Sequence, residues 1–310
     1  MDNSGIYTMG IDIGSASSKV VVLKNGAELV ASRVVQLGTG TIGPQKALEE
    51  LKAQNSYDIQ KMDYVVVTGY GRIGFEGADK QISEISCHAK GVKFVVPKAS
   101  TIIDIGGQDV KAISVGPNGI VKRFFMNDKC AAGTGRFLEV MAKILGVDIS
   151  KLAAIDEKAD YAATISSTCT VFAESEVISQ LSKGEKMQNI VAGIHQAVAS
   201  KAAALAGRCG VEDDVVLTGG VAKNAGILRA LEKELDRRVL VAPAPQITGA
   251  IGAARPKSRA SLFVGQDLLY RMNFARQWMF ALYIRRITRL QWAQRKAHFR
   301  CWKSPHARVI

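Results

Sequence analysis

Apolar runs in the first part of the chain alternate with segments of helical period. Residues 6–38 (IYTMGIDIGSASSKVVVLKNGAELVASRVVQLG) contain three Val/Ile-rich runs separated by two turns, and the second turn is an Asn-Gly pair, a common hairpin signal. A helical pattern follows at 44–54, then a buried strand run with a glycine turn at 63–72, and a second helical pattern at 79–91. The pattern predicts three strands, a helix, a strand and a helix, in this order.

A second series of the same kind begins at residue 100. The segment 100–125 repeats the strand–turn–strand pattern of the opening. Further along, a strand that leads into a glycine turn is predicted at 213–224 and another strand at 237–243, and helices are predicted at about 134–145, 172–182, 188–208 and 225–235. Strands that alternate with helices in this way indicate an α/β fold.

An eight-residue motif occurs twice, at a spacing of 92 residues. Asp12 to Lys19 (DIGSASSK) aligns with Asp104 to Lys111 (DIGGQDVK), and Asp, Ile, Gly and Lys match between the two copies. Each copy ends one apolar run and begins the next. Such self-similarity indicates duplicated domains that face each other across a cleft.

Each copy has the features of a phosphate-binding hairpin. Where a strand ends in Asp-x-Gly and turns directly into another strand, backbone N–H groups point outward and can hold phosphate oxygens. Asp12 and Asp104 would stand at strand ends, where a carboxylate can hold a hydrated Mg²⁺ or orient a water. An ordinary hairpin with a capping Asp is the alternative for one copy alone, but two copies and a third glycine turn at 218–220 favour phosphate binding. The predicted phosphate-binding residues are Gly14, Ser15, Ala16, Ser17, Ser18, Lys19, Gly106, Gly107 and Gln108.

The segment Gly38 to Gly43 (GTGTIG) fits the glycine fingerprint of dinucleotide-binding folds and follows a predicted strand. Pro44 comes next, however, and the acidic residue expected about 20 residues further on, at the end of a second strand, is missing. We therefore interpret the segment as a loop that enters a helix.

Five cysteines are scattered along the chain without a CxxC pair. Cys87 lies in a helical pattern and Cys209 ends one, so both are expected to be buried small residues. Cys130 (NDKCAAGTGRF) and Cys169 (ISSTCTVFAESEVISQ) each precede a predicted helix, where the helix dipole favours a thiolate or an anionic cluster. Two ligands are too few for a closed site, whereas a symmetric dimer would supply the four that a [4Fe–4S] cluster needs. Two inert cysteines at helix starts are the alternative.

The positive charge of the chain belongs to one region. Residues 1–254 carry 28 Lys and Arg against 27 Asp and Glu, whereas residues 255–310 carry 13 basic residues and one acid. All three tryptophans also lie in that last region. We interpret 255–310 as a basic tail of doubtful origin, either disordered or encoded out of frame, and the alternative is a basic segment that binds acidic partners. The net charge of +13 is therefore no indication of nucleic-acid binding by the rest of the chain.

Other classes of protein are disfavoured by what the sequence does not contain. No run of about 18 apolar residues predicts a transmembrane helix, and the N-terminus shows no secretory pattern of a basic region followed by an apolar one. An odd number of scattered cysteines does not suggest a disulfide framework. We expect a cytoplasmic protein, with no membrane or nucleic-acid partner.

The three glycine motifs resemble, in kind and in order, those of the superfamily of acetate kinases, sugar kinases, heat-shock ATPases and actin. The motifs are DIGSASSK, DIGGQDVK and VVLTGGVAKN. The resemblance implies two ribonuclease-H-like domains with an ATP·Mg²⁺ cleft between them, the actin-like ATPase fold, with domains at 1–98 and 99–254. It also implies nucleoside-side residues Gly219, Gly220, Asn224 and Gln246, and catalytic residues Asp12, Asp104 and Gln108, the last as the residue that positions the attacking water.

The cysteine segments NDKCAAGTGRFLEVMA and ISSTCTVFAESEVISQLSKG, together with MGIDIGSASSK, are similar to a narrower family. This is the family of ATP-dependent activators of 2-hydroxyacyl-CoA dehydratases, which is related to the ATP-binding subunits of benzoyl-CoA reductase. The resemblance covers residues 5–254. It implies an oxygen-sensitive homodimer with one [4Fe–4S] cluster held by Cys130 and Cys169 of each subunit, a reduced ferredoxin or flavodoxin as electron donor, and ATP-driven transfer of one electron to a partner dehydratase.

Two other functions remain open at this level. A small-molecule kinase of the same superfamily could use Asp104 as its catalytic carboxylate, but the paired cysteines would then be unexplained. A nucleotide-binding scaffold without hydrolysis would also fit the glycine motifs. The hydroxyacyl-CoA that the partner dehydratase uses is not encoded in this chain.

Overall fold

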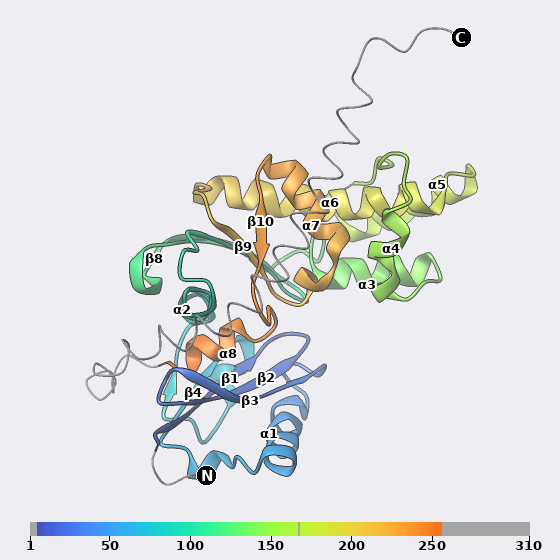
Figure 1. Cartoon of the computed structure of the whole chain (residues 1–310). Coiled ribbons are helices and arrows are strands. Elements are labelled where there is room, and N and C mark those ends of the chain that lie inside the picture. The colour runs from blue at the N-terminus through green and yellow to red at the C-terminus, as the bar shows by residue number, and fades with distance from the viewer. Residues whose placement is uncertain (1–4, 167, 256–310) are drawn as a thin grey trace, which may run out of the picture. The chain divides into compact units, whose positions relative to one another are not determined.

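A computed structural model describes residues 5–166 and 168–255 (Figure 1). Helices and strands alternate along these residues, which confirms the α/β prediction. In the first part of the chain the elements are β1 (Tyr7–Ile13), β2 (Ser18–Lys24), β3 (Glu28–Val35), α1 (Gly43–Asn55), the 3₁₀ helix η1 (Ile59–Lys61), β4 (Tyr64–Thr68), the 3₁₀ helix η2 (Tyr70–Gly74), β5 (Lys80–Gln81) and α2 (Glu84–Val95).

The second part begins with another hairpin and contains more helices than the first. Its elements are β6 (Thr101–Ile105), β7 (Val110–Val115), η3 (Pro117–Gly119), β8 (Val121–Asn127), α3 (Gly135–Ile144), η4 (Ile149–Lys151), α4 (Leu152–Asp156), α5 (Thr170–Ser182), α6 (Met187–Cys209), β9 (Val215–Thr218), η5 (Val221–Lys223), α7 (Ala225–Leu235), β10 (Val239–Val241) and α8 (Thr248–Ala253). Apart from Arg255, the predicted basic tail lies outside the described residues.

The two five-stranded sheets have the same topology. Their strand orders are β3-β2-β1-β4-β5 and β8-β7-β6-β9-β10, and in each the central strand pairs antiparallel with its hairpin partner and parallel with the strand after the crossover. The registers agree as well, because Asp12 lies opposite Lys19 and Asp104 lies opposite Lys111. The repeated motif thus occupies equivalent places in a duplicated fold.

The connection that follows the third strand differs between the two halves. Between β3 and β4 the chain forms α1 and η1 alone, whereas between β8 and β9 it forms α3, η4, α4, α5 and α6 (Figure 1). Both Cys130 and Cys169 lie in this longer connection. The second half is therefore the common frame with an added helical region.

Helices α2 and α8 cross at a very short distance because glycines line the contact. A Cβ added to Gly91 would lie 1.8 Å from the carbonyl oxygen of Thr248, and one added to Gly252 would lie 1.7 Å from that of Cys87. Gly10 of β1 meets α8 in the same way. Although α8 follows the last strand of the second sheet, it packs on α2 and on the first sheet, so the predicted division at residue 98 does not separate all contacts of the two halves.

Helix α6 is the central helix of the second half. It packs on β6, β7 and β8, and most of its apolar side chains are buried. By length and composition it is the one helix among the described residues that could cross a membrane, but 61% of its most apolar window is buried within the fold. Such burial is typical of a core helix in a globular protein.

The helix predicted at 79–91 begins later than expected. Lys80 and Gln81 form the edge strand β5, which pairs in parallel with β4, and α2 begins at Glu84. Ser83 caps α2, since its side-chain oxygen accepts a hydrogen bond from the Ser86 backbone N–H. The pairing with β4 comes from a segment far away in sequence, so the helical period of 79–83 could not reveal it.

Candidate nucleotide site and cysteine pair

A cavity of about 400 Å³ lies between the two hairpins that carry the repeated motif. At their tips the hairpins nearly touch, because a Cβ added to Gly107 would lie 2.5 Å from the Ala16 Cβ. Most of the residues predicted to bind phosphate or nucleoside line this one cavity. They are Asp12, Gly14, Ser15, Ala16, Ser17, Lys19, Asp104, Gly106, Gly107, Gly219, Gly220, Asn224 and Gln246.

The two hairpins are built alike. The Gly14 N–H donates to the Ser17 carbonyl at 3.0 Å, and the Gly106 N–H donates to the Asp109 carbonyl at 2.9 Å. In each hairpin the lysine that closes the motif pairs with the aspartate that opens it, with the lysine Nζ 3.2 Å from the carboxylate in both cases. Each hairpin thus presents a buried carboxylate and an ammonium group to the cavity.

The second hairpin has a denser set of charges than the first. Lys111 is buried and pairs with Asp104 and Asp109, and its Nζ lies 3.8 Å from the Glu84 carboxylate. Burial alone would lower the pKa of the Lys111 ammonium, but these carboxylates outweigh it and raise the pKa above its ordinary value. Lys111 therefore stays charged.

Asp104 has one oxygen without a hydrogen-bond donor. Its Oδ2 receives Lys111, whereas its Oδ1 is buried and has no hydrogen-bond partner among the described residues. Burial alone would raise the pKa of the Asp104 carboxyl, but His88 and Lys111 outweigh it and hold the pKa below its ordinary value. An ionised carboxylate that lines the cavity fits a hydrated Mg²⁺ that accompanies a bound nucleotide.

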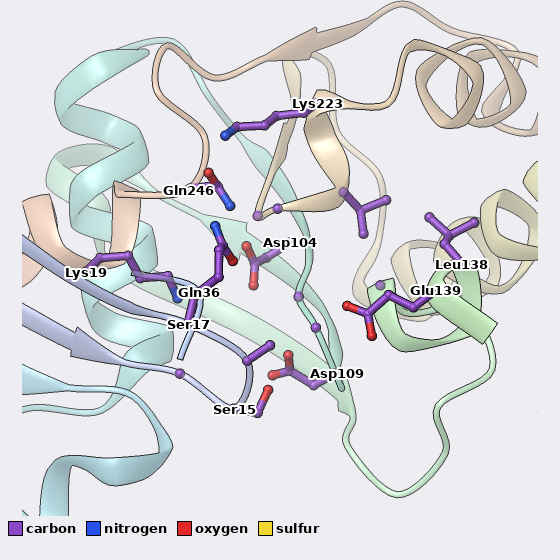
Figure 2. A pocket seen from close by; sticks show the side chains of 18 of the residues that line it. Ser15, Ser17, Lys19, Gln36, Asp104, Asp109, Leu138, Glu139, Lys223 and Gln246 are labelled. Carbon is purple, nitrogen blue, oxygen red and sulfur yellow. The ribbon is translucent and has the colours of Figure 1, made fainter. Parts of the chain in front are cut away.

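The other end of the cavity is formed by the turn after β9 and by the segment before α8. Figure 2 shows Lys223 and Gln246 at this end, away from Ser15 and Asp109. Gly219 has a φ of 90°, and a Cβ there would lie 2.3 Å from the Ile105 carbonyl oxygen, so only glycine fits. The residues predicted for the nucleoside side line this end of the cavity, and their role in binding a nucleoside stays a prediction.

Asn224 is held by a chain of hydrogen bonds that runs into the core. Its Oδ1 caps α7 by accepting from the Gly226 N–H at 2.8 Å, so its Nδ2 is the group that donates to His195 Nε2 at 3.1 Å. His195 then donates through Nδ1 to Asp156 at 2.6 Å. Burial alone would raise the pKa of Asp156, but the hydrogen bond from His195 and the charge of Arg229 hold it below its ordinary value. The network fixes the Asn224 side chain at the cavity wall.

Two predicted site residues do not line the cavity. Ser18 is buried, and its hydroxyl donates to the Leu37 carbonyl at 2.8 Å. Gln108 is exposed in the turn of the second hairpin. The loop Gly38 to Gly43 enters α1, as interpreted from its sequence, and supports the first hairpin through the Thr39 N–H, which donates to the Gly14 carbonyl at 2.9 Å.

Other lining residues were not predicted from the sequence. They are Gln36, Tyr70, Glu84, His88, Asp109, Lys111, Gly135, Leu138, Glu139, Ile149, Ser150, Ala153, Val221 and Lys223. Lys111 could have been found, because it repeats Lys19 in the second copy of the motif. Glu84 and Tyr70 could not, since helix and loop patterns do not show which side chain faces a cavity built from distant strands.

The four described cysteines fall into two pairs. Cys87 and Cys209 are buried, as expected; burial raises the pKa of the Cys87 thiol to about 11 and also raises that of Cys209. Cys130 and Cys169 are half-buried and free. The Cys130 thiol donates to the Thr168 carbonyl at 3.6 Å, which brings the loops of the two predicted ligands together.

The two half-buried cysteines stand differently toward their helices. Cys169 is the N-cap residue of α5 itself, whereas Cys130 lies in the loop ahead of α3, whose N-cap is Thr134. The ammonium group of Lys201 lies 3.7 Å from the Cys130 Sγ and places a positive charge beside that sulfur. Within residues 5–166 and 168–255, no three His, Cys, Asp or Glu side chains are grouped so that they could hold a metal ion, so one chain offers a pair of thiols.

The duplicated sheets, with two similar hairpins around one cavity, are the arrangement expected of an ATPase of actin-like fold. The model of the BadF/BadG/BcrA/BcrD ATPase family matches residues 9–255, and the chain belongs to this family. The family resemblance inferred from the cysteine segments is thereby confirmed, and the chain is an ATPase.

The chain matches several relatives over nearly their full length. The chain is 61% identical to the activator of lactoyl-CoA dehydratase from Anaerotignum propionicum over 80% of this chain and 96% of the relative. It is similar in structure to the activator of the 2-hydroxyisocaproyl-CoA dehydratase from Clostridium difficile with bound ADPNP, with a TM-score of 0.78, 52% identity and coverage of 86% of this chain and 98% of that one. Component A of the (R)-2-hydroxyglutaryl-CoA dehydratase from Acidaminococcus fermentans gives a TM-score of 0.77 at 54% identity, over 81% of this chain and 96% of that one.

Proposed function

We propose that this ATPase is the activator of a 2-hydroxyacyl-CoA dehydratase. The relatives with the highest identities quoted above are named as such activators or components, and the match extends over nearly the whole of each. The nucleotide would bind in the cavity between the hairpins, with its phosphates toward the two repeated motifs and its nucleoside toward Gly219 and Gln246. The protein would act in the cytoplasm.

The observation that carries this proposal is a direct connection between the cavity and the cysteine loop. The N–H groups of Gly135 and Arg136, at the start of α3, donate to the carbonyls of Gly106 and Gly107 at 2.9 and 2.8 Å. Gly106 and Gly107 line the cavity, and Cys130 lies in the loop that leads into α3. A movement of the second hairpin around a bound phosphate would therefore move the start of α3 and the loop that carries Cys130.

The side chains of the two hairpins would have different roles in the binding and hydrolysis of ATP. Asp12 and Asp104 would hold Mg²⁺ and its water shell, while Lys19 and Lys111 would offset negative charge on the phosphates. Gln108 would place the attacking water, which requires its turn to close over the terminal phosphate from its present exposed position. In this scheme closure of the cavity and hydrolysis are linked to each other.

Cys130 and Cys169 of two copies of the chain would together hold one [4Fe–4S] cluster, so that the working form is a homodimer. When bound, the cluster supplies one-electron transfer at low potential, from a reduced ferredoxin or flavodoxin to the dehydratase. The residues fit this group, because both thiols are free and half-buried, their loops are in contact, and Lys201 lies beside one sulfur.

Cluster binding is tested by iron and sulfide analysis of protein purified without air. We expect about four iron atoms per dimer for the unaltered chain and loss of iron in Cys130→Ser and in Cys169→Ser. Cys87→Ser and Cys209→Ser are the matched controls and should retain iron, since both side chains are buried in the fold. Four irons per monomer, or iron retained after the Cys169 change, would exclude a cluster shared between subunits.

The link between nucleotide and cysteines is tested by the rate at which a chelator removes iron in the absence of air. ATP and a non-hydrolysable analogue should change this rate in the same direction, and ADP should leave it near that of the nucleotide-free protein. Equal rates in all four conditions would mean that the cavity and the cysteine loop are not coupled.

A further inference from the structure

The turn after β4 occupies the place in the first half that the nucleoside-side turn occupies in the second. Strand β4 pairs with β1 so that Thr68 lies opposite Asp12, just as Thr218 of β9 lies opposite Asp104. The glycine that follows has a positive φ in both halves, 87° at Gly69 and 90° at Gly219.

Both glycines are packed against the opening aspartate of their own hairpin. A Cβ added to Gly69 would lie 2.6 Å from Asp12 Oδ1, and one added to Gly219 would lie 2.9 Å from Asp104 Oδ1. The backbone path out of the strand is therefore set by glycine in each half. The residue that comes next is carried to the cavity wall, since both Tyr70 and Gly220 line the cavity.

The next residue is where the two halves differ. Gly220 has no side chain of its own, and the Gln246 side chain lies beside it, whereas the first half has a tyrosine at the equivalent place. Tyr70 remains partly accessible, with 41% of its surface exposed. It lines the cavity without being a core residue, so packing alone does not explain it.

Tyr70 lines the phosphate end of the cavity, because it directly follows Gly69, which packs against Asp12 of the first hairpin. Partial burial, together with the negative charges of Asp109, Glu84 and Asp128, raises the pKa of the Tyr70 hydroxyl to about 12. The phenol therefore keeps its proton throughout the neutral range and can donate a hydrogen bond. Asp109 lies near Ser15 in Figure 2, at the end away from Lys223 and Gln246.

A neutral hydrogen-bond donor would add to phosphate binding at this end of the cavity. The acidic side chains there repel an anion, and the positive charges of Lys19 and Lys111, which would offset the phosphate charge, are shared with carboxylates. A neutral phenol can donate to a phosphate oxygen without first breaking an ion pair. Asp128, whose charge also acts on the Tyr70 hydroxyl, lies two residues before Cys130 in the loop that leads to α3.

We propose that Tyr70 distinguishes ATP from ADP by donating a hydrogen bond from its hydroxyl to the terminal phosphate of ATP. ADP lacks that phosphate, so the hydroxyl would be released and the turn Gly69 to Gly74 would lose its contact with the nucleotide. The proposal rests on the proposed nucleotide site and names within it a residue that senses the nucleotide state. It also gives the first half of the molecule a part in the signal to the cysteine loop.

The test compares the affinities of Tyr70→Phe and the unaltered chain for two nucleotides by calorimetry, with adenylyl imidodiphosphate in place of ATP. Loss of one hydrogen bond to a charged oxygen should weaken binding of the ATP analogue about tenfold and leave ADP affinity unchanged. Tyr57→Phe is the matched control, because Tyr57 packs against Tyr7 and is not a lining residue of the cavity. Unchanged ADP affinity also shows that the variant is folded.

A second measurement separates sensing from simple binding. At saturating analogue, Tyr70→Phe should reduce the effect of the nucleotide on chelator access to iron, whereas Tyr57→Phe should not. An equal loss of affinity for both nucleotides, or no loss for either, would overturn the role of Tyr70. If the unaltered chain bound neither nucleotide, the proposed nucleotide site would fail as well. If it bound both, and Tyr70→Phe left the ratio of its affinities for the ATP analogue and ADP unchanged, the proposal for Tyr70 alone would fail.

Discussion

The two halves of this protein share a frame and differ in what is added to it. Each half has a five-stranded sheet of the same order, an acidic hairpin and a glycine turn after the fourth strand of the frame. The first half connects its third and fourth strands with α1 and η1, whereas the second half uses a helical region that carries both Cys130 and Cys169. The duplicated frame forms most of the cavity wall, while the added region contributes Leu138, Glu139 and Ile149 to that wall and also carries the two cysteines proposed to hold the cluster.

The lysines of the two hairpins also differ in their burial and in the number of carboxylates around them. Lys19 has one carboxylate partner, Asp12, among the ion pairs of the described residues, and its side chain is 13% exposed. Lys111 is 4% exposed and lies among three carboxylates. The hairpin that is hydrogen-bonded to α3 is thus the one with the more buried lysine and the larger number of carboxylates around it.

The largest expected effect is on the glycines that both halves share. Gly69→Ala and Gly219→Ala should each lower the free energy of unfolding by about 3 kcal/mol or more, because alanine is strained at these φ values and its Cβ meets a carbonyl oxygen at 2.4 or 2.3 Å. Gly74→Ala is the control, since nothing lies within 4 Å of an added Cβ there. Urea denaturation measures all three, and a neutral result for only one of the pair would break the equivalence of the two turns.

The next largest effect is expected from replacing Asp12 or Asp104, the aspartates that open the two repeated motifs. Asp12→Asn and Asp104→Asn should each reduce Mg²⁺-dependent ATP hydrolysis about 100-fold, because each removes a charge from the metal and phosphate end. Asp104→Asn should also cost more stability, by about 1–3 kcal/mol, since it takes a carboxylate from the buried Lys111. Phosphate-release assays and urea denaturation give the two quantities, and equal stability losses would show that the denser charge set of the second hairpin does not matter for folding.

A smaller effect should appear in the pH dependence of stability. The pKa of the Glu84 carboxyl is raised in the folded protein, and burial is the largest cause. The folded state therefore disfavours the charged form. The stability contribution of such a group is complete below its unfolded pKa and is lost as pH rises through its folded pKa. Glu84→Gln should therefore gain stability relative to the unaltered chain as pH rises above about 4.5, by about 1 kcal/mol or less. A difference that stays constant from pH 4 to 8 would contradict this.

The smallest effect is expected from removing residues 256–310. Every lining residue of the cavity lies between Asp12 and Gln246, and the matched family region ends at residue 255. ATP affinity and iron content should therefore stay within about twofold of the values for the full chain. For ATP, a twofold change in affinity corresponds to a change of roughly 0.4 kcal/mol in binding free energy. Loss of nucleotide binding on truncation would show that this region contributes to the cavity, and the interpretation of the tail as foreign to the fold would be wrong.

Local signals predicted most of the frame correctly. Strand pairs joined by tight turns, such as β1 and β2 or β6 and β7, follow from apolar runs and glycine positions that are neighbours in sequence. The repeat gave the equivalence of Asp12 and Asp104 because a duplicated fold keeps the same residue at the same strand end. The short elements β5, α4 and α8 were missed, since each depends on contacts with distant segments.

The sequence by itself determined the class of fold, the residues of the two hairpins and the pair of cysteines that differs from the other described ones. These features are local, because a turn, a strand end and a helix start are each encoded within a few residues. Only the tertiary structure decided that Tyr70 and Glu84 reach the cavity, that Gln108 and Ser18 do not line it, and that the second hairpin is hydrogen-bonded to the helix after Cys130. The reason is that the parallel pairing of β4 with β1 and of β9 with β6, and the close crossing of α2 with α8, join segments far apart in sequence, and no local pattern records which side chains then share a wall.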